Sequence, residues 1–202
     1  MTYIGSKPAD KVLTASDITD GIISSAKIAD GTIVNDDVNA SAAIVASKLS
    51  GAGITVADQW RLTTSKTSDG DITANLERCN TGIQGTLGSA MTESSGIFTF
   101  PSTGIYQVLV AASFTGASEN AMQVLIKGTA DNSSYTTLAL IYDGQRNATD
   151  TSGGSSGSTI VDITDTSTHK IKFAAGSLSA GSSVNGHDDE NQTTFSFIRL
   201  GE

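Results

Sequence analysis

The densest cluster of titratable side chains in the sequence is the run His187, Asp188, Asp189 and Glu190. An imidazole beside carboxylates suits acid-base chemistry, and adjacent carboxylate oxygens suit calcium. The run lies in a stretch that contains Gly and Asn, as solvated loops do, and it lacks the spacing of an EF-hand. The sequence therefore predicts a loop without a resident metal, in which Asp188, Asp189 and Glu190 are the calcium candidates.

The other reactive side chains lack partners for catalysis. His169 comes directly before an expected strand, and no cysteine or activated serine can be paired with it. Cys79 is the only cysteine, so it forms no intrachain disulfide, and we expect it to pack as a small apolar residue. The glycine-rich run at 153–157 lacks the lysine and the helix of a nucleotide-binding loop. We expect no enzyme activity and no cofactor.

The composition favours strands joined by turns. Thr and Ile prefer extended backbone, whereas the abundant Gly and Ser break helices. A net charge of -9 and the absence of a concentrated Lys/Arg face argue against nucleic acid as a partner. The sequence contains no apolar stretch long enough for membrane insertion, and its first residues do not form a signal peptide. We therefore expect the chain to assemble in a cytoplasm.

Residues 95–115 are expected to form the centre of the fold. A short alternating run ends at Pro101, and the chain turns through 102–104. After the turn, apolar side chains recur at every second position, which is the spacing of a strand. The opposite face of this strand is also largely apolar, so we expect it inside a sheet and not at an edge. The alternating residues are Tyr106, Val108, Val110, Ala112 and Phe114.

The pattern of alternation and turn residues predicts an all-β sandwich or jelly roll after residue 55. Turn signals occur at 69–70, 143–144, 153–157 and 180–181. Strands are expected at 60–65, 72–78, 96–100, 105–114, 121–128, 136–142, 158–163, 170–175 and 193–200.

The last expected strand has two apolar faces. Phe195 and Phe197 point one way, and Ile198 and Leu200 point the other. One face belongs in the sandwich, and we expect a neighbouring subunit to cover the other. A loop of the same chain is the alternative cover.

Two motifs resemble the globular head of the complement C1q family, which shares its jelly roll with tumour necrosis factor. The first is Phe-x-Phe-Pro-x-x-Gly-x-Tyr at 98–106, and the second is the closing Thr-Thr-Phe-Ser-Phe-Ile-Arg-Leu at 193–200. The resemblance spans roughly residues 59–202. It implies a jelly-roll fold, a homotrimer and, in some members, calcium near the trimer axis.

Residues 18–55 carry a different pattern, an aliphatic residue about every five positions. Turns at Asp20-Gly21 and Asp30-Gly31 would present these residues along one line. One chain has almost no core for them, whereas three chains around an axis would bury them. A flexible linker is the alternative, and 41–49 is either part of the repeat or a short helix with Ser41 as N-cap. This aliphatic ladder consists of Ile18, Ile23, Ile28, Ile33, Val38, Ile44 and Leu49.

The repeat and the opening Met-Thr-Tyr-Ile-Gly-x-x-Pro-Ala-Asp resemble the N-terminal region of bacteriophage fibre and appendage proteins. We therefore expect a docking arm (1–17), a repeat stalk (18–55) and a jelly-roll knob (56–202). The expected function is that of a trimeric fibre or decoration protein of a tailed phage virion. Its partners would be capsid or tail proteins and a host-surface glycan or protein, which the loops at 145–157 and 178–192 would face. The alternative is a soluble, non-viral recognition module of the complement-head type.

Overall fold

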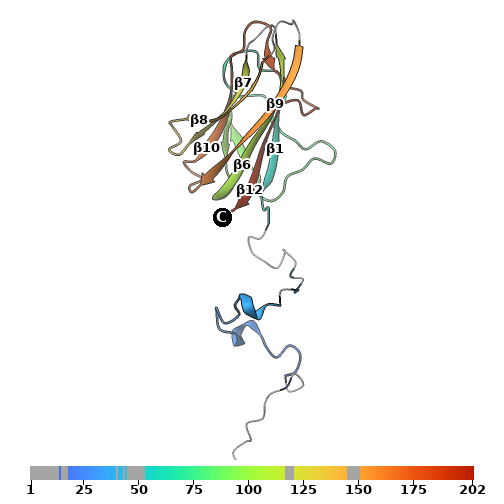
Figure 1. Cartoon of the computed structure of the whole chain (residues 1–202), viewed down its shortest axis with the longest axis vertical. Helices are drawn as coiled ribbons and strands as arrows, with labels where there is room; N and C mark the ends of the chain where they lie inside the picture. The colour runs from blue at the N-terminus through green and yellow to red at the C-terminus, as the bar shows by residue number, and fades with distance from the viewer. Residues whose placement is uncertain are drawn as a thin grey trace, which may run out of the picture. The chain divides into compact units, whose positions relative to one another are not determined.

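The computed structural model describes residues 14, 18–39, 41, 42, 44, 53–116, 121–144 and 151–202. The chain divides into two compact units, residues 1–45 and 46–202. The described residues of the first unit contain two single-turn 3-10 helices, η2 (Ser25–Lys27) and η3 (Asn35–Asp37). The second unit, the knob, contains strands and no helix among its described residues (Figure 1), which confirms the predicted all-β class.

Twelve strands form the described part of the knob. They are β1 (Ala57–Leu62), β2 (Gly70–Asp71), β3 (Leu76–Arg78), β4 (Thr92–Ser94), β5 (Ile97–Thr99), β6 (Gly104–Gly116), β7 (Met122–Thr129), β8 (Thr136–Asp143), β9 (Thr151–Ile163), β10 (Lys170–Gly176), β11 (Ser183–Val184) and β12 (Thr194–Gly201).

The strands form two antiparallel sheets that pack as a sandwich. In sheet A the order is β9, β6, β12, β1, β3, and the short β11 pairs with the far end of β6 beyond β12. In sheet B the order is β8, β7, β10, β5, β4, and β2 pairs with β10 beside β5. Consecutive strands often lie in different sheets, as in a jelly roll. The long strand β6 is internal to its sheet, as its two apolar faces predicted.

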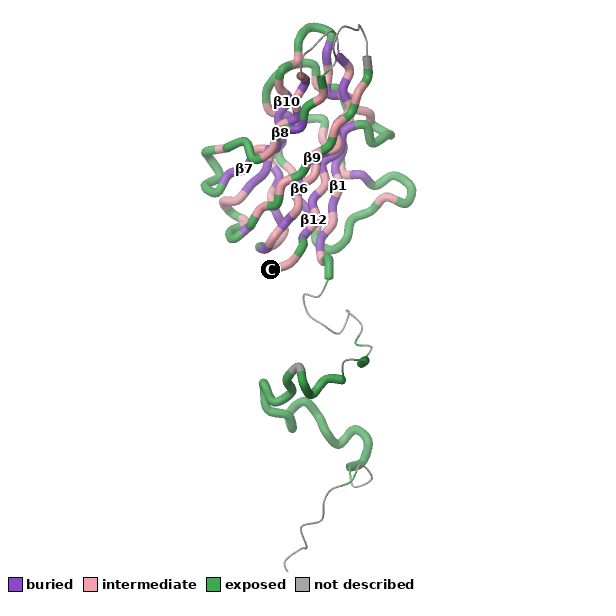
Figure 2. Tube along the Cα trace, in the orientation of Figure 1, coloured by how far each residue is buried: buried purple, intermediate pink, exposed green. Residues whose placement is uncertain are grey.

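The buried residues lie between the sheets (Figure 2), and the core includes a connected cluster of aromatic rings. All the predicted inward residues of β6 are buried. Phe173 of sheet B stacks on Phe195 of sheet A with 4.2 Å between ring centroids. Phe98 meets Trp60 edge-on at 5.3 Å, and such pairs add to the free energy gained by burying the rings.

The chain crosses from sheet B to sheet A between β5 and β6, within the motif at 98–106. Gly104 has φ +130°, and a Cβ there would lie 2.4 Å from the carbonyl oxygen of Gly201. The Tyr106 hydroxyl donates to the Ser102 carbonyl at 3.0 Å and closes the same corner. The glycine is therefore required both by the backbone conformation and by the approach of β12.

Two sequence predictions about the knob are wrong. Of the expected strand at 72–78 only β3 (Leu76–Arg78) forms, because 72–75 lead from β2 in sheet B to β3 in sheet A and the chain turns at Asn75, which has φ +60°. The glycine-rich run at 153–157 is not a turn but part of β9, which pairs with β6 along its whole length. Small residues are needed there, since a Cβ on Gly157 would lie 2.7 Å from Cγ1 of Ile141 in β8.

The described part of the stalk region has a ten-residue repeat, in which a hydrogen-bonded turn is followed by a single-turn 3-10 helix. Backbone N–H to C=O bonds close turns from Ile22 to Thr19, and from Thr32 to Ala29. A third such turn closes from Ala42 to Asn39, and the two 3-10 helices lie between the turns. Turn and helix alternate every five residues, which explains the period of the ladder. Most of 41–49 lies outside the described residues, so its helical alternative stays open.

Candidate assembly surfaces

The aliphatic ladder is exposed in the single chain. Six of its seven members are described, and their exposed fractions lie between 38% and 58%. Leu49 lies outside the described residues. The turns at Asp20-Gly21 and Asp30-Gly31 are present, and both glycines have the left-handed φ that such turns require. Exposed aliphatic residues in a regular series are the mark of an interaction surface.

The outer face of sheet A is a second candidate surface. Leu109 of β6, Ser196 of β12 and Gln59 of β1 lie side by side in register, and all three are half-buried. The neighbouring row contains Ile160 of β9, which is 65% exposed, and the half-buried Ile198. We define this outer face by Ala57, Gln59, Gln107, Leu109, Ala111, Ser156, Ser158, Ile160, Ser196 and Ile198, none of which is charged.

The last strand has the predicted division of faces. Phe195 and Phe197 are fully buried in the core of their own chain, so their side chains cannot also contact a partner. Ile198 and Leu200 point away from the core, and the described residues of the chain leave Leu200 46% exposed. If β12 contacts a second subunit, it does so through Ile198 and Leu200.

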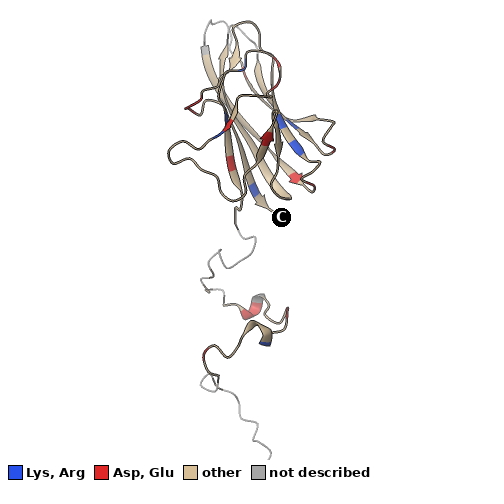
Figure 3. Cartoon of the chain, turned by 180° about the vertical axis from the view of Figure 1, so that it is seen from behind, with Lys and Arg blue, Asp and Glu red and all other residues tan. Residues whose placement is uncertain are grey.

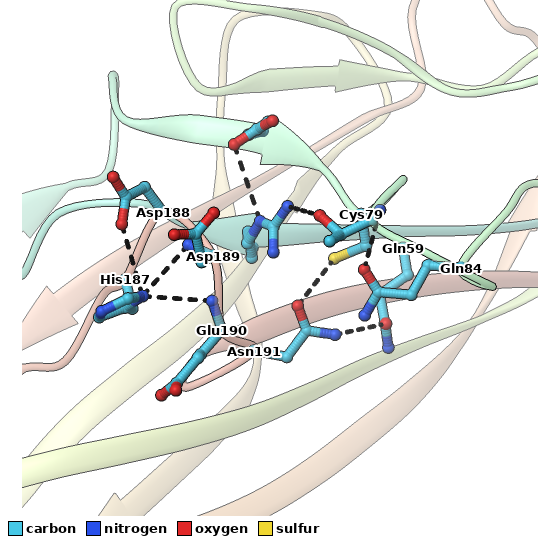
Figure 4. Close-up of polar contacts among 11 residues, drawn as sticks. Gln59, Cys79, Gln84, His187, Asp188, Asp189, Glu190 and Asn191 are labelled. Carbon is cyan, nitrogen blue, oxygen red and sulfur yellow. Dashed lines mark hydrogen bonds and ion pairs between the residues drawn. The ribbon is translucent and has the colours of Figure 1, made fainter.

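The run His187–Glu190 is a turn held by its own imidazole (Figure 4). Nδ1 of His187 accepts the backbone N–H groups of Asp189 at 3.1 Å and Glu190 at 3.2 Å. Asp188 lies on the same loop, 3.4 Å from that nitrogen. Within the described residues, no three His, Cys, Asp or Glu side chains are placed to hold a metal ion. The geometry therefore lends no support to the calcium candidates.

Cys79 fixes this loop to the edge of sheet A. Its thiol is buried and donates to Oδ1 of Asn191 at 3.3 Å, and Nδ2 of Asn191 donates to Oε1 of Gln59 at 3.2 Å (Figure 4). Burial raises the pKa of the Cys79 thiol, so the thiol stays protonated and is a poor nucleophile. His169 lies elsewhere, with hydroxyl groups of Thr164 and Thr168 at its two ring nitrogens.

Arg61 continues the row of outer-face residues on β1 but brings no charge to the surface. Its side chain is 1% exposed, and it donates to Oγ1 of Thr81 at 2.9 Å. The carboxylate of Glu77 lies 3.7 Å from Nε. Figure 3 shows few Lys and Arg residues along the knob, together with Asp and Glu residues. The ten defining residues of the outer face are uncharged, and the exposed charged residues on the same side of sheet A, Asp162 of β9 and Glu77 of β3, lie at its borders.

A buried carboxylate beside this face, that of Asp58 on β1, was not among the residues expected to be functional. Both of its oxygens accept from Nε of Arg78, at 3.0 and 3.2 Å. They also accept from the indole of Trp60 at 3.1 Å and from the backbone N–H of Met91 at 2.9 Å. Asp58 thus ties the segment 79–91 to β1. The detectable signal was an acid at an inward position of the alternation Asp58, Trp60, Leu62.

The outer face of sheet B carries a charged network of its own. Lys127 and Lys172 are directly opposed across β7 and β10, and like charges in that position repel. Asp71 lies between them and accepts from Lys127 at 3.2 Å and Lys172 at 2.6 Å. Burial alone would raise the pKa of Asp71, but the hydrogen bonds from Lys172 and Lys127 outweigh it and hold the pKa below its usual value.

Because the pKa of Asp71 is lower in the folded chain, its stabilising contribution is present above the unfolded pKa and is lost as the pH falls. We expect Asp71→Asn to lower the free energy of unfolding at about pH 6 and to lower it less at about pH 2. Urea unfolding of both proteins at the two pH values measures this. An equal loss at both values would show that the carboxylate charge is not the cause.

Of three comparisons with known proteins, the one with solved structures found similar folds. No protein-family model and no curated protein matches the chain. Among solved structures, the Eiger TNF of S. frugiperda superposes with a TM-score of 0.56 at 13% identity, covering 74% of this chain and 95% of that one. Murine APRIL at pH 5.0 superposes with a TM-score of 0.54 at 12% identity, covering 72% and 98%. The knob therefore has the TNF-like jelly roll that the sequence motifs predicted.

The described residues include no helix that is long and apolar enough to span a membrane.

Proposed function

We propose that this chain is a structural virion protein of a tailed bacteriophage, a homotrimer that docks by its N-terminal region and displays the jelly-roll knob. The exposed aliphatic ladder carries this proposal, and the resemblance of the N-terminal repeat to phage appendage proteins supplies the setting. Assembly would occur in the host cytoplasm, and the mature location would be the virion. No catalytic step is assigned, because association and display are the proposed mechanism.

The ladder favours a trimer over a flexible linker on energetic grounds. Burying a fully exposed Ile or Val side chain stabilises an assembly by about 1.5–3 kcal/mol, and the ladder residues retain roughly half of that exposure. Six such residues per chain, meeting copies of themselves, would offset the entropy lost on association. A linker would not need a hydrogen-bonded turn at each repeat.

The outer face of sheet A supports the same oligomer independently. Its ten defining side chains are uncharged, so a second knob can pack on them without burying an unpaired charge, and Asp162 and Glu77 lie on the same side of the sheet at its borders. The complement-head resemblance implies a trimer for such a domain. The alternative function, a soluble recognition module outside a virus, would share this face but would leave the ladder without a docking role.

Sedimentation equilibrium of the full chain tests the oligomer. We expect a mass three times that of the 20.7-kDa chain at micromolar concentration. A monodisperse monomer would overturn the trimer. Immunogold labelling of purified virions with an antibody to the knob tests the location, and unlabelled particles beside abundant free trimer would favour the non-viral alternative.

A further inference from the structure

A cleft of about 550 Å³ opens at the edge of the sandwich where the β7–β8 and β9–β10 turns lie together. Both sheets line it with core-facing positions, Gly128 and Ile171 of sheet B and Val161 and Ile163 of sheet A, so the cleft enters between the sheets. Its volume is within the range of pockets that bind small molecules. The cleft is distinct from the ladder and from the outer face of sheet A.

Two features of the β7–β8 hairpin keep the sandwich open at this edge. Strand β8 has a one-residue irregularity at Leu138, opposite Ile126 and Lys127. Gly128 has no side chain, and a Cβ there would lie 2.5 Å from Cδ1 of Leu138. Leu138 therefore lies over a glycine, and 42% of this residue stays exposed although it lines the cleft.

The walls of the cleft are aliphatic. Leu138 and the half-buried Val161 contribute its accessible apolar surface, and Ile163 and Ile171, which are 3% and 2% exposed, close its inner end. Asp162 alternates with Val161 and Ile163 on β9, so its side chain lies on the outer face of sheet A and only its backbone reaches the cleft. An aliphatic group in the cleft would therefore remove water from apolar surface, which is favourable.

The carboxylate at the rim, that of Asp131, is held by its own chain. Its Oδ1 accepts from Oγ1 of Thr129 at 2.7 Å and from the backbone N–H groups of Ser133 at 2.8 Å and Ser134 at 2.7 Å. Hydrogen bonds from Ser134, Thr129 and Ser133 hold the pKa of Asp131 well below the usual range, so the group stays ionised in the folded chain. This charge opposes the entry of a ligand with an anionic end.

The basic side chains of the lining are engaged as well. Lys170 precedes the core-facing Ile171, so its side chain lies on the outer face of sheet B. Its Nζ donates to Oγ1 of Thr99 at 2.9 Å and to the carbonyl of Thr166 at 2.6 Å. The two ring nitrogens of His169 each lie beside a threonine hydroxyl, at 3.4 and 3.1 Å. These groups therefore leave no cation directed into the cleft for a charged ligand.

We propose that this cleft binds a small uncharged molecule with an aliphatic body, such as an alcohol. The aliphatic walls suit the body, and the hydroxyl groups of Ser134 and Thr136 at the rim suit a neutral polar end. The proposal concerns the knob alone and does not depend on the ladder or on a phage origin.

Methyl NMR of the full chain, labelled at Ile, Leu and Val, tests the proposal. The probes are 1-hexanol, hexanoate and hexylammonium, which have equal chain lengths and differ in charge. We expect hexanol to shift the methyl signals of Leu138, Val161 and Ile171 and to leave those of Leu109 and Ile160, on the outer face of sheet A, unchanged. Hexanoate should bind at least about threefold more weakly, and hexylammonium should bind no more tightly than hexanol.

Leu138→Ala should weaken hexanol binding by about three- to tenfold, because it removes apolar contact area from the wall. The matched control is Leu140→Ala, the same change on the same strand. Leu140 is 45% exposed and pairs with Leu125 on the outer face of sheet B, so its replacement should leave the affinity unchanged.

Equal affinities of the two variants would overturn the proposal, as would tighter binding of hexylammonium than of hexanol. Shifts of the Leu109 and Ile160 signals as large as those of the cleft would show unspecific binding and would also overturn it. Shifts of the cleft signals on dilution of the protein alone would do the same, because a second copy would then occupy the cleft.

Discussion

Replacing Asp58 by alanine should lower the free energy of unfolding by about 3–5 kcal/mol, a large part of the stability of an ordinary domain. The carboxylate is fully buried and receives hydrogen bonds from Arg78, Trp60 and Met91. Alanine would leave the Arg78 guanidinium, which lies 4.6 Å above the Trp60 ring, without its anion. It would also leave two N–H donors of the interior unpaired, and each carries a desolvation penalty.

Urea unfolding of Asp58→Ala, Asp58→Asn and Asp188→Ala measures this effect. Asparagine keeps an acceptor and the shape, so its cost should be intermediate. Asp188 has a 79% exposed side chain, so its replacement should change the free energy of unfolding by no more than about 0.5 kcal/mol. A loss below about 1 kcal/mol for Asp58→Ala would show that Arg78 finds another partner or water.

Loss of this network has a consequence for assembly as well as for stability. The Asp58 carboxylate holds Met91 and receives a further hydrogen bond from Thr86 at 3.3 Å. Directly after Thr86, Leu87 pairs with Ala57 at the border of the outer face and is half exposed. Asp58 therefore positions the segment at the border of the outer face of sheet A, although its own side chain is buried on the other side of the sheet.

Strands were predicted best where an alternation of apolar and polar residues directly followed a recognisable turn. In β6, five inward apolar residues follow a Pro and Gly corner, and local pattern and tertiary position agree. The prediction for the first half of β9 was wrong for the opposite reason. Its Gly and Ser residues have low strand propensity, but the long partner β6 and the crowding at Gly157 impose an extended conformation on them.

The candidate surfaces were only partly accessible to sequence reasoning. A period of five identified the ladder, because each turn of its repeat places one aliphatic residue. A cleft at the edge of the sandwich depends on the one-residue shift of β8 opposite Lys127 and on the proximity of the β7–β8 and β9–β10 turns, which are distant along the chain. No single-sequence pattern encodes either feature. Asp58 was similarly hidden, since its partners outside β1 lie 20 to 33 residues away.

Placing charge on the ladder tests the proposed assembly most directly. The double substitution Ile28→Asp and Ile33→Asp puts two carboxylates at consecutive positions of the series, so a trimer would bury six like charges. We expect the dissociation constant of the trimer to rise by at least about a hundredfold and incorporation into particles to be lost. Analytical ultracentrifugation and particle composition measure the two effects.

The control for that experiment is Ser25→Asp with Thr32→Asp, which adds the same charge at exposed polar positions between ladder residues. It should leave both the trimer and incorporation unchanged, because these side chains lie outside the series. The thermal unfolding of the knob should be the same in both variants, since the knob has its own core. If the Ile28 and Ile33 variant still sedimented as three chains and entered particles normally, the ladder would be a surface without a partner. The outer face of sheet A would then have to account for association alone.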